Sequence, residues 1–196
     1  MLAIVDSGGA NIASVRFALE RLGVQSELTA DPAVIRAAER VILPGVGSAA
    51  EGMKRLQARG LVDCVRGLTQ PVLGVCLGMQ LLFESSEEGP TETLGLIPGR
   101  VALLPGGPGV TVPHMGWNTV LTGKPVALLD GIAPDARFYF VHSYAGPVNA
   151  FTLASCDHGT PFAAIVQRGN FSGVQFHPER SGPAGARLLR NFLTLA

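Results

Sequence analysis

Apolar residues recur with two different periods along the chain, and the change falls near residue 100. In the first half, short apolar runs alternate with stretches in which apolar residues recur every three or four positions, the period of an amphipathic helix. The runs lie at 2–5, 24–28, 41–43 and 71–75, and the helical stretches at 12–22, 48–60 and 76–84. Strands that are nearly all apolar and separated by helices predict a mostly parallel sheet covered on both sides.

Residues that cap helices stand where this pattern needs them. Asn11 can begin the first helix and Gly23 can end it. Ser48 is followed by Glu51 at the spacing of a capping box, in which each of these two side chains accepts a backbone N–H of the other's residue. These signals support an alternation of strands and helices through the first half of the chain.

From about residue 100, short strand-like runs are separated by turn residues. They lie at 101–104, 119–121, 137–141, 151–156, 162–167 and 173–176, and we expect them as antiparallel or mixed additions to the sheet. A last helix is expected from about 183 to 195, with Leu188, Leu189, Phe192 and Leu193 facing the core. The pattern therefore predicts one α/β domain over residues 1–196, with a central, mostly parallel sheet and antiparallel additions in its second half.

Composition narrows the possible functions. The 196 residues contain 15 Lys and Arg against 15 Asp and Glu, and this zero net charge argues against a protein that binds nucleic acid or an anionic membrane. Only 15% of residues are charged and 47% are apolar, which argues against a disordered chain. The first residues lack a basic leader, and no apolar run approaches the roughly 18 residues of a membrane helix. We therefore expect a cytoplasmic protein.

Three cysteines, odd in number and far apart, predict neither a disulfide framework nor a metal site. The sequence Gly74-Val-Cys76-Leu-Gly78 has the spacing of a nucleophile elbow, in which a reactive side chain occupies a tight turn from strand to helix. A thiol at a helix N-terminus lies near unpaired backbone N–H groups, which favour the thiolate. Cys76 is therefore the predicted nucleophile, with a buried structural cysteine as the alternative. Cys156, close to His158 but at a strand end, and Cys64 are weaker candidates.

A cysteine nucleophile needs a base, and the base needs an orienting group. In His177-Pro178-Glu179, the proline holds His177 extended, so that the side chains of His177 and Glu179 project to the same side. The carboxylate can then orient the imidazole and stabilise its protonated form. On its own this tripeptide is more typical of a polar turn. Together with the predicted nucleophile elbow at Cys76, it favours a catalytic role.

An oxyanion formed during catalysis needs backbone N–H donors or fixed polar groups. The N–H of Leu77, directly after the nucleophile, is one natural donor. The loop Leu43-Pro-Gly45-Val-Gly47-Ser48 contains two glycines that permit a close backbone approach. A flexible loop is the alternative. Neither GxxxxGK[ST] nor GxGxxG occurs, so nucleotide binding is not indicated, and no cofactor is predicted.

Three strings together resemble the class I (triad) glutamine amidotransferases: Pro44-Gly-Val-Gly47, Gly74-Val-Cys-Leu-Gly-Met-Gln80 and His177-Pro-Glu179, in that family's order and spacing. The resemblance covers essentially the whole chain and implies a three-layer, flavodoxin-like fold. It implies that Cys76 attacks the side-chain amide of glutamine, that His177 protonates the departing ammonia and then activates water, and that Glu179 orients His177.

The resemblance also implies the other site residues. Gly47 and Leu77 flank the oxyanion, beside Val46, whose peptide would complete that site. The positions that match those holding the amino-acid end of the substrate, or that lie on the segment contacting it, are Gln80, Glu88, Ser143 and Tyr144.

Three further strings are most similar to the glutaminase subunits of imidazole glycerol phosphate synthases: Pro113-His-Met-Gly-Trp-Asn118, Phe138-Tyr-Phe-Val-His-Ser-Tyr144 and His177-Pro-Glu-Arg-Ser-Gly182. Such subunits deliver ammonia to a separate (β/α)8-barrel cyclase subunit, because ammonia released into neutral water would be protonated and lost as a nucleophile. The positions that this resemblance places at the barrel are Asn11, Trp117, Asn118 and Tyr139. The lone Trp, in a predicted glycine-rich turn, suits an interface anchor or a core residue equally.

Two positions depart from that pattern. The loop Asp6-Ser-Gly-Gly-Ala-Asn11 lacks the aromatic residue that commonly follows the Asp, and Arg180 stands where some members have Lys. Three alternatives remain open: a glutaminase that serves another acceptor, as in anthranilate or pyridoxal phosphate synthesis, a catalytically silent scaffold, and a cysteine hydrolase of a related fold.

Overall fold

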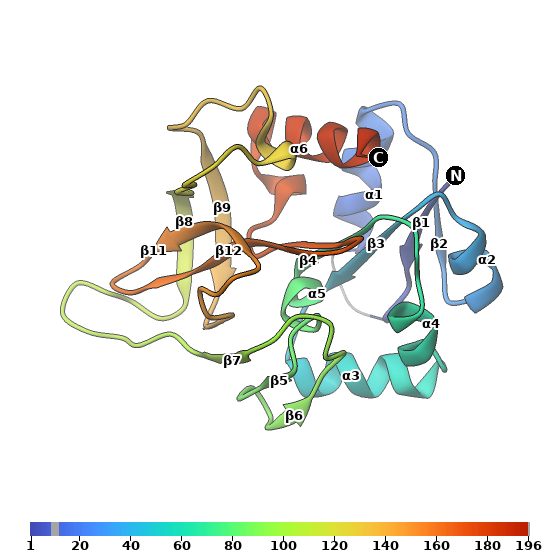
Figure 1. The fold of residues 1–196 in the computed structure, drawn as a ribbon, viewed down its shortest axis with the longest axis horizontal. Coiled ribbons are helices and arrows are strands. Elements are labelled where there is room, and N and C mark those ends of the chain that lie inside the picture. The colour runs from blue at the N-terminus through green and yellow to red at the C-terminus, as the bar shows by residue number, and fades with distance from the viewer. Residues whose placement is uncertain (9–11, 196) are drawn as a thin grey trace.

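The computed structural model describes residues 1–8 and 12–195, and Figure 1 shows helices on both sides of a central sheet. Seven strands form this sheet in the order β11-β12-β13-β4-β3-β1-β2. The five from β13 to β2 pair in parallel, whereas β12 is antiparallel to both of its neighbours. The bounds are β1 Leu2–Val5, β2 Ser26–Thr29, β3 Arg40–Gly45, β4 Val72–Cys76, β11 Thr152–Asp157, β12 Pro161–Arg168 and β13 Phe171–Val174. The predicted mostly parallel sheet with antiparallel additions is confirmed.

Successive side chains of the central strands enter two different cores, which explains why those strands are apolar throughout. In β1, Leu2 and Ile4 belong to one buried cluster, while Ala3 and Val5 belong to the other. The first cluster lies under α1 (Ile12–Arg21) and α6 (Gly182–Thr194). The second lies under α2 (Pro32–Ala37), α3 (Ala49–Ala58), α4 (Val62–Arg66) and α5 (Leu77–Gln80).

The helical period predicted over 76–84 is wrong beyond its first turn, because α5 ends at Gln80. Leu81, Leu82 and Phe83 are fully buried, so their apolar character reflects burial rather than a helix face. Their backbone carbonyls accept hydrogen bonds from N–H groups of residues 94–97 instead of from the next helical turn. The short helices α2 and α4 were not predicted, since one or two turns leave too little periodicity to detect.

Several second-half strands do not join the central sheet, which corrects the prediction. The strand β7 (Arg100–Leu103) belongs to a four-stranded sheet, and β8 (His114–Thr119) pairs only with β9 (Arg137–His142) in an antiparallel ribbon. The other members of the four-stranded sheet are β5 (Ser85–Ser86), β6 (Thr91–Glu92) and β10 (Tyr144–Ala145). The expected strand at 119–121 reduces to the end of β8 and one isolated bridge at Leu121.

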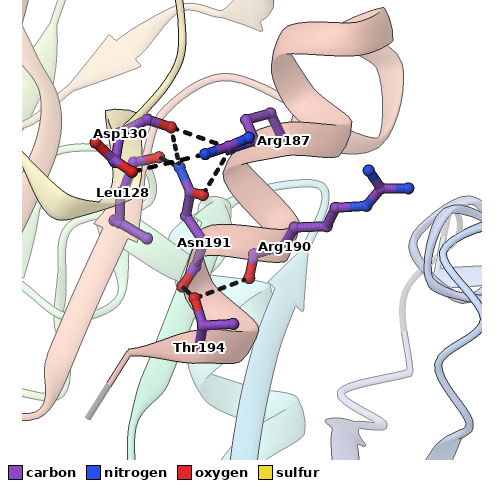
Figure 2. Close-up of polar contacts among 6 residues, drawn as sticks. All are labelled: Leu128, Asp130, Arg187, Arg190, Asn191 and Thr194. Carbon is purple, nitrogen blue, oxygen red and sulfur yellow. Dashed lines mark hydrogen bonds and ion pairs between the residues drawn. The ribbon is translucent and has the colours of Figure 1, made fainter.

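The final helix is tied to the rest of the molecule by a polar cluster, which Figure 2 shows. Asn191 of α6 is buried, and its Nδ2 donates to the carbonyl of Leu128 at 3.0 Å and to that of Asp130 at 2.8 Å. Arg187 donates from Nε to the Asp130 carbonyl at 3.1 Å and to Oδ1 of Asn191 at 3.0 Å. These carbonyls lie within and just after the 3-10 helix η1 (Ala127–Leu129), so α6 and this connection hold each other in place.

On the core side of α6, Leu188, Leu189 and Phe192 are buried and Leu193 is partly buried, as predicted. Among residues 1–8 and 12–195, no helix combines the length and the apolar character needed to cross a membrane.

Candidate active site

Cys76 lies at the junction of β4 and α5, in the tight turn that the sequence predicts. Its backbone has φ 53° and ψ −111°, and among the described residues it is the only residue other than glycine with a positive φ. A Cβ on Gly78 would lie 1.8 Å from the carbonyl oxygen of Leu43, and one on Gly74 would lie 2.7 Å from that of Gly78. The turn can therefore form only with glycine at both positions, and it presents the thiol at the start of a helix.

His177 and Glu179 meet as their spacing predicts. The backbone of His177 is extended, and its Nδ1 lies 2.7 Å from Oε1 of Glu179, with both side chains nearly inaccessible to solvent. Burial opposes protonation of the imidazole, but hydrogen bonds to Cys76 and Glu179 and the negative charge of both partners outweigh it and raise the pKa of His177 to about 10. The imidazole is thus placed between a thiol and a carboxylate.

The predicted catalytic, oxyanion and substrate residues converge on one cavity of about 580 Å³, with Glu179 behind His177 as the exception. Its walls come from the loop after β3, the elbow, the turn after β5 and the ends of β9 and β10. The sequence-predicted residues that line it are Val46, Gly47, Cys76, Leu77, Gln80, Glu88, Ser143, Tyr144 and His177.

The loop after β3 forms the wall expected to hold an oxyanion. Gly45 lies opposite Cys76 in the pairing of β3 with β4, and a Cβ there would lie 3.0 Å from Cβ of Leu77. Gly47 has φ +91°, a conformation that L side chains rarely adopt, although the space around it is open. Leu77 is the first residue of α5, where a backbone N–H has no partner within the helix. The two backbone segments thus flank the thiol.

Gln80 and Glu88 also line the cavity, Gln80 from α5 and Glu88 from the turn after β5. Gln80 is 4% exposed, and its Nε2 donates to the carbonyl of Tyr144 at 2.7 Å. Glu88 follows β5 in a turn, and its Oε2 accepts a hydrogen bond from the backbone N–H of Ala49, at the start of α3. Burial raises the pKa of Glu88, and the hydrogen bond from Ala49 partly offsets this effect.

The other two cysteines do not line this cavity. Cys156 is fully buried in β11, and burial together with the charge of Asp157 raises its pKa to about 12. Cys64 is buried in α4, where burial also raises its pKa. Both thiols are therefore poor nucleophiles at neutral pH, in agreement with the choice of Cys76.

Gln175 and Arg180 are among the residues at the site that the sequence analysis did not assign to it. Gln175 is fully buried, and its Nε2 lies 3.8 Å from Sγ of Cys76. Its position two residues before His177 on an extended segment was a usable signal, because residues at that spacing project to the same side. Arg180 lines the cavity, and its guanidinium carbon lies 5.2 Å from the centre of the Tyr139 ring. No sequence pattern pointed to that contact.

Of the residues expected to contact a partner, Trp117 and Asn118 lie in β8 and Tyr139 lies in β9. Trp117 and Tyr139 are opposite each other, with ring centres 5.9 Å apart, and Trp117 is 50% exposed, which excludes a core position. Trp117 lies in a strand rather than in the turn that its neighbouring glycine suggested. Asn118 donates from Nδ2 to the carbonyl of Asp157 at 2.9 Å, which engages it within the chain. Asn11 lies outside the described residues.

Relatives of known name match the whole chain. A subunit of imidazole glycerol phosphate synthase from Xanthomonas axonopodis pv. citri, named HisH, is 56% identical over 195 residues, which cover 100% of this chain and 98% of the relative. A subunit of the same name from Xylella fastidiosa strain Temecula1 is 54% identical over 194 residues, covering 99% of this chain and 97% of the relative.

Solved structures share the fold at low identity. A putative GMP synthase protein from Thermoplasma acidophilum superposes with a TM-score of 0.75 at 18% identity, covering 98% of this chain and 91% of the other. A structure described as a glutamine amidotransferase gives a TM-score of 0.74 at 21% identity, covering 97% of this chain and 96% of the other. The family model described as glutamine amidotransferase class-I matches residues 3–196. The chain therefore belongs to the class I glutamine amidotransferase family.

Proposed function

We propose that this chain is the glutaminase subunit of an imidazole glycerol phosphate synthase, acting as one domain over residues 1–196. Relatives at 54–56% identity over nearly their whole length carry that subunit's name, which supports this role. The observation that carries the catalytic proposal is the arrangement of the Cys76 thiol on a strained elbow beside an imidazole that is itself bonded to a buried carboxylate.

The proposed reaction follows from this arrangement. The thiolate of Cys76 attacks the side-chain carbonyl carbon of L-glutamine, and the backbone donors around Gly47 and Leu77 stabilise the negative charge on the carbonyl oxygen. The C–N bond breaks as the His177 imidazolium gives its proton to the departing ammonia, which leaves a glutamyl thioester. His177 then takes a proton from water, whose oxygen attacks the thioester, and breaking of the C–S bond releases glutamate and restores the thiol.

Glu179 makes both steps possible, because its hydrogen bond to Nδ1 leaves Nε2 of His177 to exchange protons at the reaction centre. Gln80, Glu88, Ser143 and Tyr144, which line the same cavity, are the proposed contacts for the amino-acid end of glutamine. The partly buried carboxyl of Glu88 on the cavity wall suits recognition of the ammonium group of glutamine.

The proposed partner is a (β/α)8-barrel cyclase subunit that receives ammonia. The half-exposed Trp117, packed edge-on against Tyr139, has the character of an interface anchor. Arg180 reaches from the cavity wall to the ring of Tyr139, so this face adjoins the site of ammonia release. A partner seated there would shield ammonia from water.

Glutamate release by the wild-type chain and by Cys76→Ala, each with and without the nucleotide-loaded cyclase subunit, tests the proposal. We expect slow release by the wild type alone, faster release with the loaded partner, and none from Cys76→Ala. Equal rates for the two proteins would refute the nucleophile, and an absence of any effect of the partner would refute the coupling.

A further inference from the structure

A buried amide lies against the nucleophile from the strand next to it. β13 pairs in parallel with β4, with Gly173 opposite Gly74 and Val174 opposite Val75. One further step places Gln175 beside Cys76, and the two side chains do meet, with 3.8 Å between Nε2 of Gln175 and Sγ of Cys76. Gln175 has no exposed surface, so water cannot replace this contact.

A chain of hydrogen bonds determines which end of the Gln175 amide faces the sulfur. The backbone carbonyl of Tyr144 can only accept, so the Gln80 atom that lies 2.7 Å from it must be the donor Nε2. The same Nε2 lies 3.0 Å from the amide of Gln175, whose facing atom must therefore be the acceptor Oε1. The NH2 group of Gln175 is left to face Cys76.

We propose that Gln175 is a positioning residue for the nucleophile: its Nε2–H donates to Sγ of Cys76, stabilises the thiolate and aims it at the cavity. The inference rests on the proposed function in one respect, the role of Cys76 as nucleophile. A hydrogen bond to an ionised acceptor is stronger than one between neutral groups, and a buried amide cannot satisfy this N–H with water. The Tyr144 carbonyl fixes the orientation of the Gln80 amide, and Gln80 in turn prevents the Gln175 amide from turning its oxygen toward the sulfur.

Gln80 therefore has a second role beside the substrate contact proposed for it. Both protons of its Nε2 are used within the protein, one by Tyr144 and one by Gln175, which leaves its Oε1 for other partners. The hydrogen bonds from Gln80 to Gln175 and from Gln175 to Cys76 thus connect the wall of the cavity to the nucleophile.

The test measures the reactivity of Cys76 against pH in the isolated full chain. Wild type, Gln175→Leu, Gln175→Glu and the control Gln167→Leu are treated with iodoacetamide from about pH 4 to pH 10, and mass spectrometry of the Cys76 peptide gives the rate. Gln167 is a matched control because it is an exposed glutamine on the neighbouring strand β12. The buried Cys64 and Cys156 report in the same samples whether a variant has opened the fold.

We expect the midpoint of the rate profile to rise by about one pH unit in Gln175→Leu, which corresponds to about a tenfold loss of thiolate at a fixed pH below it. In Gln175→Glu we expect a larger rise, because the carboxylate still accepts from Gln80 but brings a negative charge to the sulfur. Glutamate release should fall about tenfold in kcat in Gln175→Leu with little change in KM, and Gln167→Leu should match the wild type.

A profile with the same midpoint in Gln175→Leu and Gln175→Glu as in the wild type would overturn the inference, even if both variants lose activity. If Gln175→Leu unfolds, Gln175→Glu decides alone, because it keeps the volume and the hydrogen bond with Gln80. The alkylation needs neither glutamine nor a partner. A wild type that fails to hydrolyse glutamine with its partner would thus refute the proposed function, whereas an unchanged midpoint in an active enzyme would refute only the role of Gln175.

Discussion

Replacing His114 by Phe should make the protein markedly less sensitive to acid. The His114 ring is 5% exposed and stacks on Phe140 and on His158, with ring centres 4.9 and 4.1 Å away. Burial, with a smaller contribution from the nearby His158, lowers its pKa from 6.5 to about 4. Its Nδ1 is buried and has no hydrogen-bond partner among the described residues. Its Nε2 lies 3.4 Å from Nδ2 of Asn118, which also donates to the carbonyl of Asp157, so a phenyl ring gives up one long contact whose donor keeps another partner.

The size of the effect follows from the difference in proton binding. Between pH 6.5 and about pH 4 the unfolded chain binds a proton at residue 114 and the folded chain does not, so acid favours unfolding by about 1.4 kcal/mol per pH unit. From pH 8 to pH 5, the free energy of unfolding of the wild type should fall by about 2 kcal/mol through this residue alone. Burial lowers the pKa of His142 to about 3, so this residue lowers the free energy of unfolding by a similar amount in wild type and in His114→Phe.

His177 acts in the opposite direction. Its raised pKa stabilises the fold fully below pH 6.5, and this stabilisation is lost as the pH rises toward about 10. Because wild type and His114→Phe share this contribution, it cancels when the two are compared.

Urea unfolding at pH 8, 7, 6 and 5 measures the effect as the difference in free energy of unfolding between His114→Phe and wild type. We expect that difference to grow by about 2 kcal/mol in favour of the variant as the pH falls to 5. Overpacking by the phenyl ring would shift all four values equally and so leave the trend intact. Phe162→Leu, in the same buried cluster, serves as the control and should show no trend. Parallel curves for His114→Phe and wild type would refute the assignment of a buried, neutral imidazole.

Four further changes probe other parts of the molecule. Gly78→Ala should abolish glutamate release and lower the melting temperature, because its Cβ would overlap the Leu43 carbonyl, whereas Gly123→Ala, in open space, should do neither. Glu179→Gln should lower the pKa of His177 and reduce kcat/KM by roughly 10²- to 10⁴-fold, and an unchanged rate would remove Glu179 from the triad. Asn191→Leu should lower the free energy of unfolding in urea by about 2 kcal/mol, with kcat unaffected, because the Leu128 carbonyl loses the donor Asn191 and the Asp130 carbonyl keeps only Arg187 (Figure 2). Trp117→Ala should weaken the affinity for the proposed cyclase subunit, measured by titration, about 30-fold or more, without changing the melting temperature of the isolated chain.

The sequence by itself determined the central sheet and the local arrangement of the proposed nucleophile and base, which lie at or shortly after the ends of β4 and β13. The apolar strands predicted a parallel sheet because a strand buried on both faces has no polar positions to spare, and β1, β3 and β4 follow that pattern. The elbow was predictable because its strand end, two glycines, cysteine and helix start follow one another in the sequence, and the steric exclusion at Gly74 acts against Gly78 within the same turn. The pairing of His177 with Glu179 was predictable for the same reason, since an extended backbone alone brings their side chains together.

Only the tertiary structure decided how segments far apart in the chain meet. Whether a second-half strand joins the central sheet depends on its partner rather than on its own residues, and β8 with β9 forms a separate ribbon that leaves Trp117 half exposed. The contact of Gln175 with Cys76 depends on the register between β13 and β4, which are separated by almost a hundred residues of sequence. The orientation of that amide depends in turn on a carbonyl of a third segment, at Tyr144. Such hydrogen bonds leave no periodic pattern in the sequence, because their partners are chosen by packing.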